Sequence, residues 1–168
     1  MSGFNADTSD RFQQALNELL PQKPKGLILD LRNNPGGLLD QAQRITAAWV
    51  GDQIVVKERS QGHIFEELHG IGRARVSGIR TMVLVNKGSA SASEIVAGAL
   101  QDYGLATLIG EKTFGKGSVQ EVRDFENGSA LKVTIAEWLT PKERTIHKTG
   151  LEPDIVVEHT PEDYEAKR

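Results

Sequence analysis

The chain has 168 residues, with 20 Lys and Arg against 23 Asp and Glu, a formal net charge of −3, and 38% hydrophobic residues. This charge balance argues against a broad nucleic-acid-binding surface, and the hydrophobic content is that of an ordinary globular domain. The chain contains no cysteine, which excludes disulfides and thiolate chemistry. No run approaches the roughly 20 apolar residues of a membrane span.

The hydrophobic pattern predicts helices that alternate with buried strands. Helical spacing of apolar residues is found at 9–20, 38–50 and 91–103. Strands are predicted at 26–31, 53–60, 63–68, 81–86, 106–110, 117–125, 129–140 and 154–158. The sequence ENGS at 126–129 is typical of a hairpin turn, and the polar tail at 159–168 is expected to fray. This alternation predicts an α/β fold in a single domain, since 168 residues are enough for one substantial core.

Two loops each follow a buried strand and open a helix. They lie within LDLRNNPGGLL and VLVNKGSASASEI. In α/β sheets, ligands gather at the carboxyl ends of the strands, and the N–H groups of a helix start favour negative charge there. If the two loops are adjacent in space, we expect them to frame one site.

The second loop contains three serines, Ser89, Ser91 and Ser93. Ser91 and Glu94 match the S-x-x-E capping box, so Ser91 is either a helix cap or a nucleophile. The two roles share one geometry, because a serine at a helix start lies beside backbone N–H groups that can stabilise an oxyanion.

A serine nucleophile needs a base, and two residue types are available. The four histidines lie in charged or polar runs, which favours surface positions: His63, His69, His147 and His159. Lys116 is flanked by two glycines in a loop that follows an apolar strand. Packing against backbone would desolvate Lys116 and lower its pKa, which makes a lysine a base. Lys112 lacks this glycine frame, and a solvated loop lysine is the alternative for both.

Four motifs together resemble the catalytic core of the C-terminal processing peptidases, or tail-specific proteases. They are DLRNNPGG, NKGSASASEIVAGAL, GEKTFGKGSVQ and GLEPDI, and the resemblance extends from about Phe4 to Val157. It implies a serine endopeptidase with a Ser–Lys dyad that cleaves near the C-terminal tails of proteins. It also implies a crotonase/Clp-peptidase-like core of repeated ββα units with a mixed sheet. The family's bacterial and plastidial members act outside the cytoplasm, in the periplasm, cell envelope or plastid lumen.

Matched residue by residue, the resemblance makes Ser91 the nucleophile, Lys116 the general base and Gln120 the residue that orients Lys116. It also implies an oxyanion hole formed by the backbone N–H groups of Gly36, Gly37 and Ala92. In an extended segment, Lys116 and Gln120 would project to the same side. A neutral amide could hold the amine there, whereas a carboxylate would raise its pKa.

Members of the family normally carry a PDZ domain ahead of the catalytic core, whereas the sequence as given begins at what resembles the core itself, so we expect a fragment whose PDZ domain and signal peptide belong to a longer parent. We therefore expect residues 1–168 to be a catalytic core with weak or no activity by itself. No cofactor or metal is expected, since the chain has no H-E-x-x-H motif, and no nucleic-acid partner is expected either. The sequence does not indicate an oligomeric state. A phosphate-binding loop is disfavoured because no G-K-[ST] follows the NNPGG segment.

The remaining alternative is a non-catalytic module of the same fold that binds an apolar ligand or a peptide. Such a module need not keep the serine, the lysine and the glutamine together, whereas this chain has Ser91, Lys116 and Gln120.

Overall fold

The computed structural model describes residues 1–157, so the predicted tail at 159–168 lies outside the described residues. The helices are α1 (Thr8–Leu19), the short 3-10 helix η1 (Leu20–Gln22), α2 (Leu39–Val50) and α3 (Ala92–Asp102). The strands are β1 (Leu27–Asp30), β2 (Ile54–Ser60), β3 (His63–His69), β4 (Thr81–Val85), β5 (Ala106–Gly110), β6 (Ser118–Asp124), β7 (Ala130–Leu139) and β8 (Ile155–Val156). Within residues 1–157, no helix is long and apolar enough to cross a membrane.

The strands form two sheets. One is parallel, in the order β1-β4-β5-β8, and the other is antiparallel, in the order β3-β2-β7-β6. The α/β prediction is confirmed, with the parallel and antiparallel pairings of the expected mixed arrangement divided between the two sheets.

The register of the parallel sheet places three loops side by side. Asp30 pairs with Leu84 at the ends of β1 and β4, and Val85 pairs with Gly110 at the ends of β4 and β5. The three strands therefore finish at the same edge, where the loops that follow them emerge together.

Helix α3 forms the centre of the core. It packs against α2, β2 and β5, and most of its side chains are buried. A helix that is apolar on all sides is expected to be buried in this way. Gly98 allows the close approach of neighbouring chain, because a Cβ at this position would lie 2.8 Å from the Thr140 side chain.

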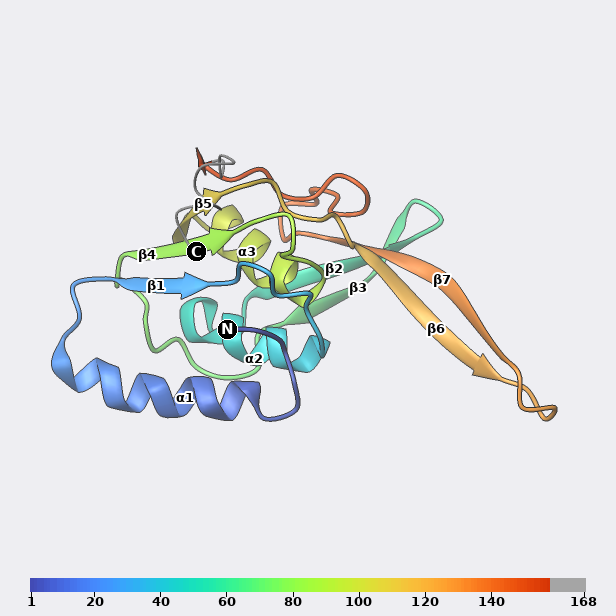
Figure 1. Ribbon diagram of the computed structural model, residues 1–168, viewed down its shortest axis with the longest axis horizontal. Helices are drawn as coiled ribbons and strands as arrows, with labels where there is room; N and C mark the ends of the chain where they lie inside the picture. The colour runs from blue at the N-terminus through green and yellow to red at the C-terminus, as the bar shows by residue number, and fades with distance from the viewer. Residues whose placement is uncertain (158–168) are drawn as a thin grey trace, which may run out of the picture.

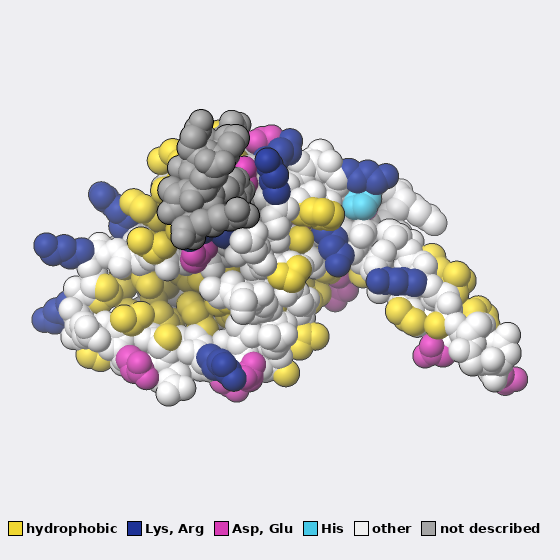
Figure 2. Space-filling view, viewed as in Figure 1, with side chains coloured by type: hydrophobic (Ala, Val, Ile, Leu, Met, Phe, Trp, Pro, Cys, Tyr) yellow, Lys and Arg dark blue, Asp and Glu magenta, His cyan; other side chains and the backbone are white. Residues whose placement is uncertain are grey.

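A long hairpin projects from the body (Figure 1). It consists of β6 and β7, joined through the predicted turn at 126–129. Strand β2 pairs with β7 only at residues 137–139, so the outer part of the hairpin has no third strand. Figure 2 shows apolar side chains along this arm, where the exposed ones include Val122, Phe125, Leu131, Val133 and Ile135.

The role of α3 gives a stability test. Leu100 is fully buried, so Leu100→Ala should lower the free energy of unfolding by about 2–5 kcal/mol through lost burial and a residual cavity. Leu131→Ala is the matched control, because Leu131 is 49% exposed on the arm and surface changes usually stay within about 0.5 kcal/mol. Denaturant unfolding of both variants measures the difference, and equal midpoints would contradict the central role of α3.

Candidate active site

The two predicted loops are adjacent, and two of the three serines join them. The Ser89 hydroxyl donates to the Leu31 carbonyl oxygen at 2.8 Å. The Ser93 hydroxyl donates to the Asn34 carbonyl oxygen at 2.9 Å, and that oxygen also accepts the Ala90 N–H at 3.0 Å. Both serine side chains are fully buried. Ser89 and Ser93 therefore hold the loops together, and their hydroxyls are engaged in doing so.

A pair of asparagines adds a second connection between these loops. The Asn86 side-chain oxygen accepts the Asn33 N–H at 2.8 Å, and the Asn86 amide nitrogen donates to the Asn33 side-chain oxygen at 2.9 Å. Nothing in the sequence pattern distinguishes these two residues. Asparagines directly after strands are common turn formers, so the pattern carried no signal of a reciprocal contact.

Ser91 differs from its neighbours in its hydrogen bonding. Its hydroxyl donates no hydrogen bond within residues 1–157, although the residue is only 7% exposed. The capping box is present in outline, because the side chain faces the Glu94 N–H and the Glu94 carboxylate accepts the Ser91 N–H at 2.9 Å. The Glu94 N–H, however, makes its short bond to the Ser91 carbonyl oxygen, at 2.8 Å. The cap thus leaves the hydroxyl proton of Ser91 free to be donated.

The backbone of Ser91 is strained. Its φ of 58° and ψ of −118° lie in a region that non-glycine residues rarely adopt, at a cost of about 1–3 kcal/mol. The residue stands between the loop after β4 and the first turn of α3. Hydrolases expose a nucleophilic serine on the same kind of sharp strand-to-helix turn, so this strain is a functional signal.

Two backbone N–H groups beside Ser91 are available. Within residues 1–157, the N–H groups of Gly37 and Ala92 donate to no acceptor. The N–H of Gly36, by contrast, donates to the Asn34 side-chain oxygen at 2.9 Å. Gly36 is therefore not a free donor as predicted, because the amide of Asn34 stabilises the turn by accepting this proton.

Gly36 has a steric role. A Cβ at this position would lie 2.7 Å from the Ser91 Cβ and 2.8 Å from the Ala92 nitrogen. With φ at 97°, the backbone also disfavours any residue with a side chain. Gly36 thus leaves the space in front of the Ala92 N–H open.

The buried carboxylate of Glu94 connects the serine loop (residues 86–91) to the lysine loop (residues 111–117). One oxygen accepts the Thr113 hydroxyl and the Gly115 N–H, the latter at 2.7 Å. The other oxygen accepts the N–H groups of Ser91 and Lys116, each at 2.9 Å. The backbone nitrogens of the predicted nucleophile and base therefore lie on one oxygen atom. The capping-box spacing revealed only the contact with Ser91.

The side chain of Lys116 is exposed, so the predicted desolvation is not found. The flanking glycines take the close contacts instead. A Cβ on Gly115 would lie 2.9 Å from the Gly150 nitrogen, and one on Gly117 would lie 2.5 Å from the His147 nitrogen. The glycine frame therefore lets the lysine loop pack against residues 146–150, while the lysine side chain points away from this packing.

The structure does not couple the predicted dyad through its side chains. Within the described part of the chain, neither the Lys116 amine nor the Gln120 side chain forms a hydrogen bond, and Gln120 is exposed on β6. Catalytic hydrogen bonds in unliganded sites are often long and tighten when substrate binds. In this structure, the serine and lysine loops are joined through their backbone N–H groups, which Glu94 accepts, and not through the side chains of Ser91, Lys116 and Gln120.

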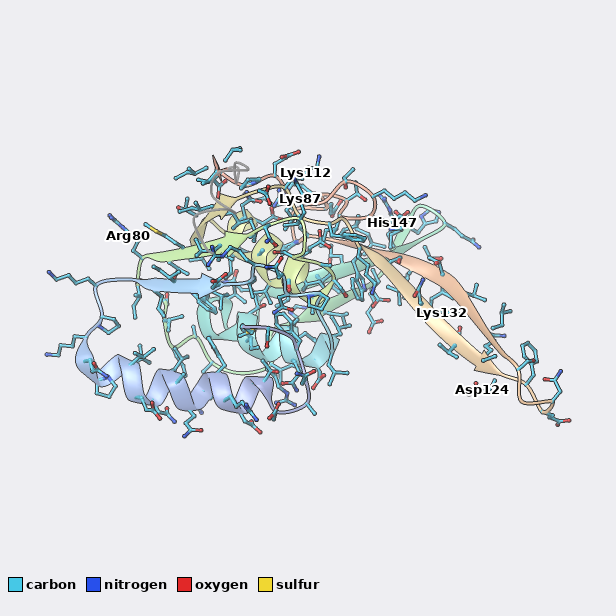
Figure 3. The ribbon with its side chains drawn as sticks, in the orientation of Figure 1. Arg80, Lys87, Lys112, Asp124, Lys132 and His147 are labelled. Carbon is cyan, nitrogen blue, oxygen red and sulfur yellow. The ribbon has the colours of Figure 1, made fainter. Side chains whose placement is uncertain are left out.

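Two of the other candidate bases lie near Lys116, Lys112 in the same loop between β5 and β6 and His147 with its backbone against Gly117. Lys112 is exposed and pairs with Glu152 at 2.6 Å. His147 lies near the base of the arm (Figure 3), and His63 and His69 begin and end β3. His159 lies outside the described residues. Among residues 1–157, no group of three or more acidic or histidine side chains could hold a metal ion.

An ion pair at the end of β1 was also missed by sequence reasoning. The Arg32 guanidinium contacts the Asp30 carboxylate through two hydrogen bonds, at 2.9 and 2.7 Å. These bonds lower the pKa of Asp30 below its usual value. Because the folded-state pKa is lowered, the stabilisation is present above the unfolded-state pKa and is lost as the pH falls through the folded-state value.

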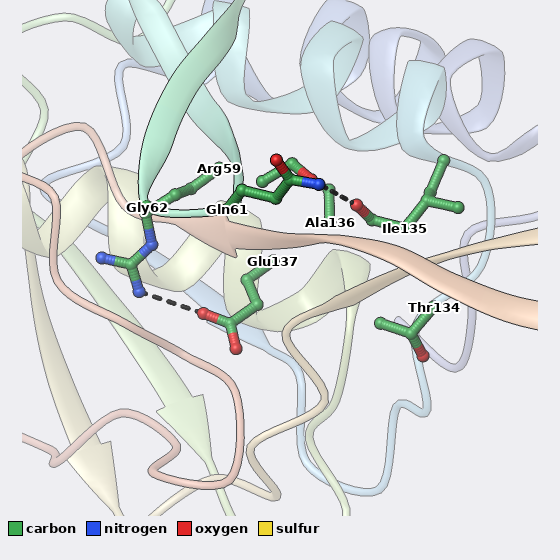
Figure 4. A pocket seen from close by; sticks show the side chains of 8 residues that line it. Arg59, Gln61, Gly62, Thr134, Ile135, Ala136 and Glu137 are labelled. Atoms are coloured by element: carbon green, nitrogen blue, oxygen red, sulfur yellow. Dashed lines mark hydrogen bonds and ion pairs between the residues drawn. The ribbon is translucent and has the colours of Figure 1, made fainter.

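A cavity of about 380 Å³ lies away from these loops, between the β2–β3 turn and β7. Figure 4 shows that Arg59 and Glu137 line it and form an ion pair there. Its lining does not include Ser91 or Lys116. The cavity is therefore not part of the candidate active site.

Comparison with known proteins gives consistent results. Residues 1–157 match the model of peptidase family S41. A carboxyl-terminal-processing protease of Picosynechococcus sp. (strain ATCC 27264 / PCC 7002 / PR-6) is 41% identical over 164 residues, which cover 98% of this chain and 39% of the relative. Its counterpart in Synechocystis sp. (strain ATCC 27184 / PCC 6803 / Kazusa) is 44% identical over 158 residues, which cover 94% of this chain and 37% of the relative.

Solved structures share the fold. The photosystem II D1 C-terminal processing protease superposes with a TM-score of 0.90 at 39% identity, covering 94% of this chain and 41% of that one. Mature CPAF in complex with lactacystin superposes with a TM-score of 0.78 at 16% identity, covering 95% of this chain and 44% of that one, a likeness of fold alone. The chain thus spans about two fifths of the length of these relatives.

The connection through Glu94 can be tested by one substitution. Glu94→Gln replaces an accepting oxygen with an NH₂ group, so two buried donors lose their acceptor at about 1–3 kcal/mol each. We expect the free energy of unfolding to fall by at least about 2 kcal/mol. Glu126→Gln, at the exposed hairpin turn, is the control and should change it by less than about 0.5 kcal/mol. Chemical denaturation compares the two, and a Glu94→Gln variant as stable as the control would refute the connection.

Proposed function

Because the chain belongs to peptidase family S41, whose model matches residues 1–157, we propose that it is a serine endopeptidase core with a Ser91–Lys116 dyad. The observation that carries the proposal is the state of Ser91, which combines a strained backbone at a helix start with a hydroxyl that donates no hydrogen bond within residues 1–157. The fixed hydroxyls of Ser89 and Ser93 leave Ser91 as the nucleophile of this loop.

The proposed reaction begins when the neutral amine of Lys116 takes the proton of the Ser91 hydroxyl. The oxygen attacks the carbonyl carbon of the scissile bond, and the N–H groups of Gly37 and Ala92 stabilise the developing oxyanion. The amine then gives its proton to the leaving nitrogen, which yields an acyl-enzyme. A water molecule, deprotonated by the same amine, hydrolyses this ester and restores Ser91.

The lysine side chain must approach Ser91 for this reaction. The backbone nitrogens of Ser91 and Lys116 each lie 2.9 Å from the same Glu94 oxygen, so the distance between them is at most twice that length. A lysine side chain is long enough to reach across this distance. Gln120 follows Lys116 by four residues and lies in β6, the strand that begins just after the lysine loop. We assign it the role of holding the amine in this position, as the sequence resemblance implies.

The substrate class follows from the relatives, two of which are named carboxyl-terminal-processing proteases. We propose that the substrates are protein C-terminal tails and that the whole protein acts outside the cytoplasm. The alternative of a non-catalytic apolar-ligand or peptide-binding module is disfavoured, because ligand binding alone requires neither the strain at Ser91 nor two free N–H groups beside it.

The serine assignment predicts a contrast between three alanine variants. In the whole protein, Ser91→Ala should abolish hydrolysis of an unstructured tail peptide and labelling by a fluorophosphonate, while costing at most about 1 kcal/mol of stability through the lost cap contact with the Glu94 N–H. Ser89→Ala and Ser93→Ala should each lose about 1 kcal/mol of stability through a missing buried hydrogen bond, while keeping the label. Mass spectrometry locates the labelled residue, and a label on any serine other than Ser91 would refute the assignment.

The lysine assignment predicts that a permanent charge is inactive. Lys116→Arg keeps the positive charge but cannot supply a neutral base, because a guanidinium remains protonated. Peptide hydrolysis should therefore be lost as completely as in Lys116→Ala, whereas the control Lys112→Arg should keep the parental rate. Turnover in Lys116→Arg would show that another residue acts as the base.

A further inference from the structure

Strand β6 begins at the candidate active site and has an unpaired edge. It starts two residues after Lys116, and it is the outermost strand in the order β3-β2-β7-β6. Among residues 1–157, its only strand partner is β7. The unpaired edge therefore runs from the lysine loop outward along the arm.

The backbone groups on this edge can be identified from the register. The Gly117 carbonyl oxygen accepts the Trp138 N–H, and the Phe125 N–H donates to the Ser129 carbonyl oxygen, both at 2.8 Å and both toward β7. Strand backbone groups alternate in direction along the chain, so the odd-numbered residues between them also face β7. The N–H and C=O groups of Ser118, Gln120, Val122 and Asp124 face outward.

The opposite edge of the arm is less accessible. The β2–β3 hairpin covers its inner end, where the Ser60 hydroxyl donates to the Ile135 carbonyl oxygen at 2.9 Å and Arg59 pairs with Glu137 at 3.0 Å. On β6, by contrast, Val122 is 57% exposed and Phe125, just beyond the strand, is 51% exposed. Strand β6 also contains no proline, one of the residues that commonly protect an edge from pairing.

We propose that the outward edge of β6 binds the extended main chain of the peptide substrate as an additional strand. The proposal rests on the serine-peptidase function above and deepens it. Strand addition supplies affinity through main-chain hydrogen bonds and is tolerant of sequence, which suits an enzyme that cleaves unstructured tails. Because β6 starts at the lysine loop, a strand paired with it is delivered to Ser91 and Lys116, and Val122 and Phe125 offer apolar contacts farther along.

Binding can be measured without catalysis in a Ser91→Ala background. The probe is a fluorescein-labelled extended peptide that ends in apolar residues, followed by fluorescence anisotropy. Val122→Pro removes only an outward-facing N–H, which an edge strand tolerates, and should weaken binding by at least about tenfold. Val122→Ala, which keeps the N–H, is the matched control and should bind within about threefold of the parent, since it loses only one exposed side chain.

A second measurement leaves the protein unchanged. A peptide with N-methyl groups on alternate residues cannot donate on one side, so one of the two possible alternations should lose binding and the other should keep it. Equal affinity for both alternations, or for the proline and alanine variants, would overturn the proposal. Size-exclusion chromatography of the same variants detects the competing outcome, in which the edge pairs with a second copy of the chain. A change in oligomeric state with unchanged peptide binding would also overturn it.

Fluorophosphonate labelling of the Val122→Pro protein with Ser91 intact separates this proposal from the proposed function. Labelling at the parental rate together with weakened peptide binding supports both. Labelling at the parental rate together with peptide binding unchanged from the parent leaves the nucleophile in place and rejects the β6 edge. Peptide binding that depends on Val122 without labelling supports the edge and rejects the nucleophile.

Discussion

The arrangement of the candidate active site depends on one buried carboxylate. Glu94 has no exposed surface, yet its two oxygens accept four donors from the helix start and from residues 113–116. A buried charge is tolerated only when it is hydrogen-bonded in this way. The lysine loop, which connects the parallel sheet to the antiparallel arm, thereby has a fixed place beside Ser91. The four donors that stabilise the buried carboxylate thus also join the helix start to residues 113–116, two segments that the two sheets would otherwise position separately.

The strain at Ser91 is maintained by its surroundings. The loop before it is held by the buried hydroxyls of Ser89 and Ser93, and the helix after it is packed on several sides. An unfavourable backbone conformation persists when neighbouring structure determines it. The serine-rich segment therefore divides two tasks between its members. The outer serines secure the loops, and the hydroxyl proton of the middle one is left free for chemistry.

Local patterns in the sequence predicted most of the fold, because helices such as 38–50 and strands such as 106–110 have clear periodicity. They also indicated that the loops after β1 and β4 could frame one site if they were adjacent, and the structure shows that they are adjacent. They did not predict the partners of Glu94 at residues 113–116, because spacing along a helix carries no information on contacts twenty residues away. The exposure of Lys116 matches the solvated loop lysine that the sequence left open as the alternative to desolvation. A G-K-G sequence indicates close backbone packing, but only the tertiary structure decides whether the glycines or the lysine face it.

The contact of Gly36 with Ser91 provides a way to sort homologous sequences. Any side chain at this position would occupy the space between the serine Cβ and the Ala92 nitrogen. A homologue that keeps the serine, lysine and glutamine but has another residue in place of this glycine would thus be expected to have lost peptidase activity. Genome surveys that judge such proteins by the dyad alone would count these degenerate copies as enzymes. Residue 36 therefore belongs in the sequence signature that separates active peptidases from non-catalytic descendants of the same fold.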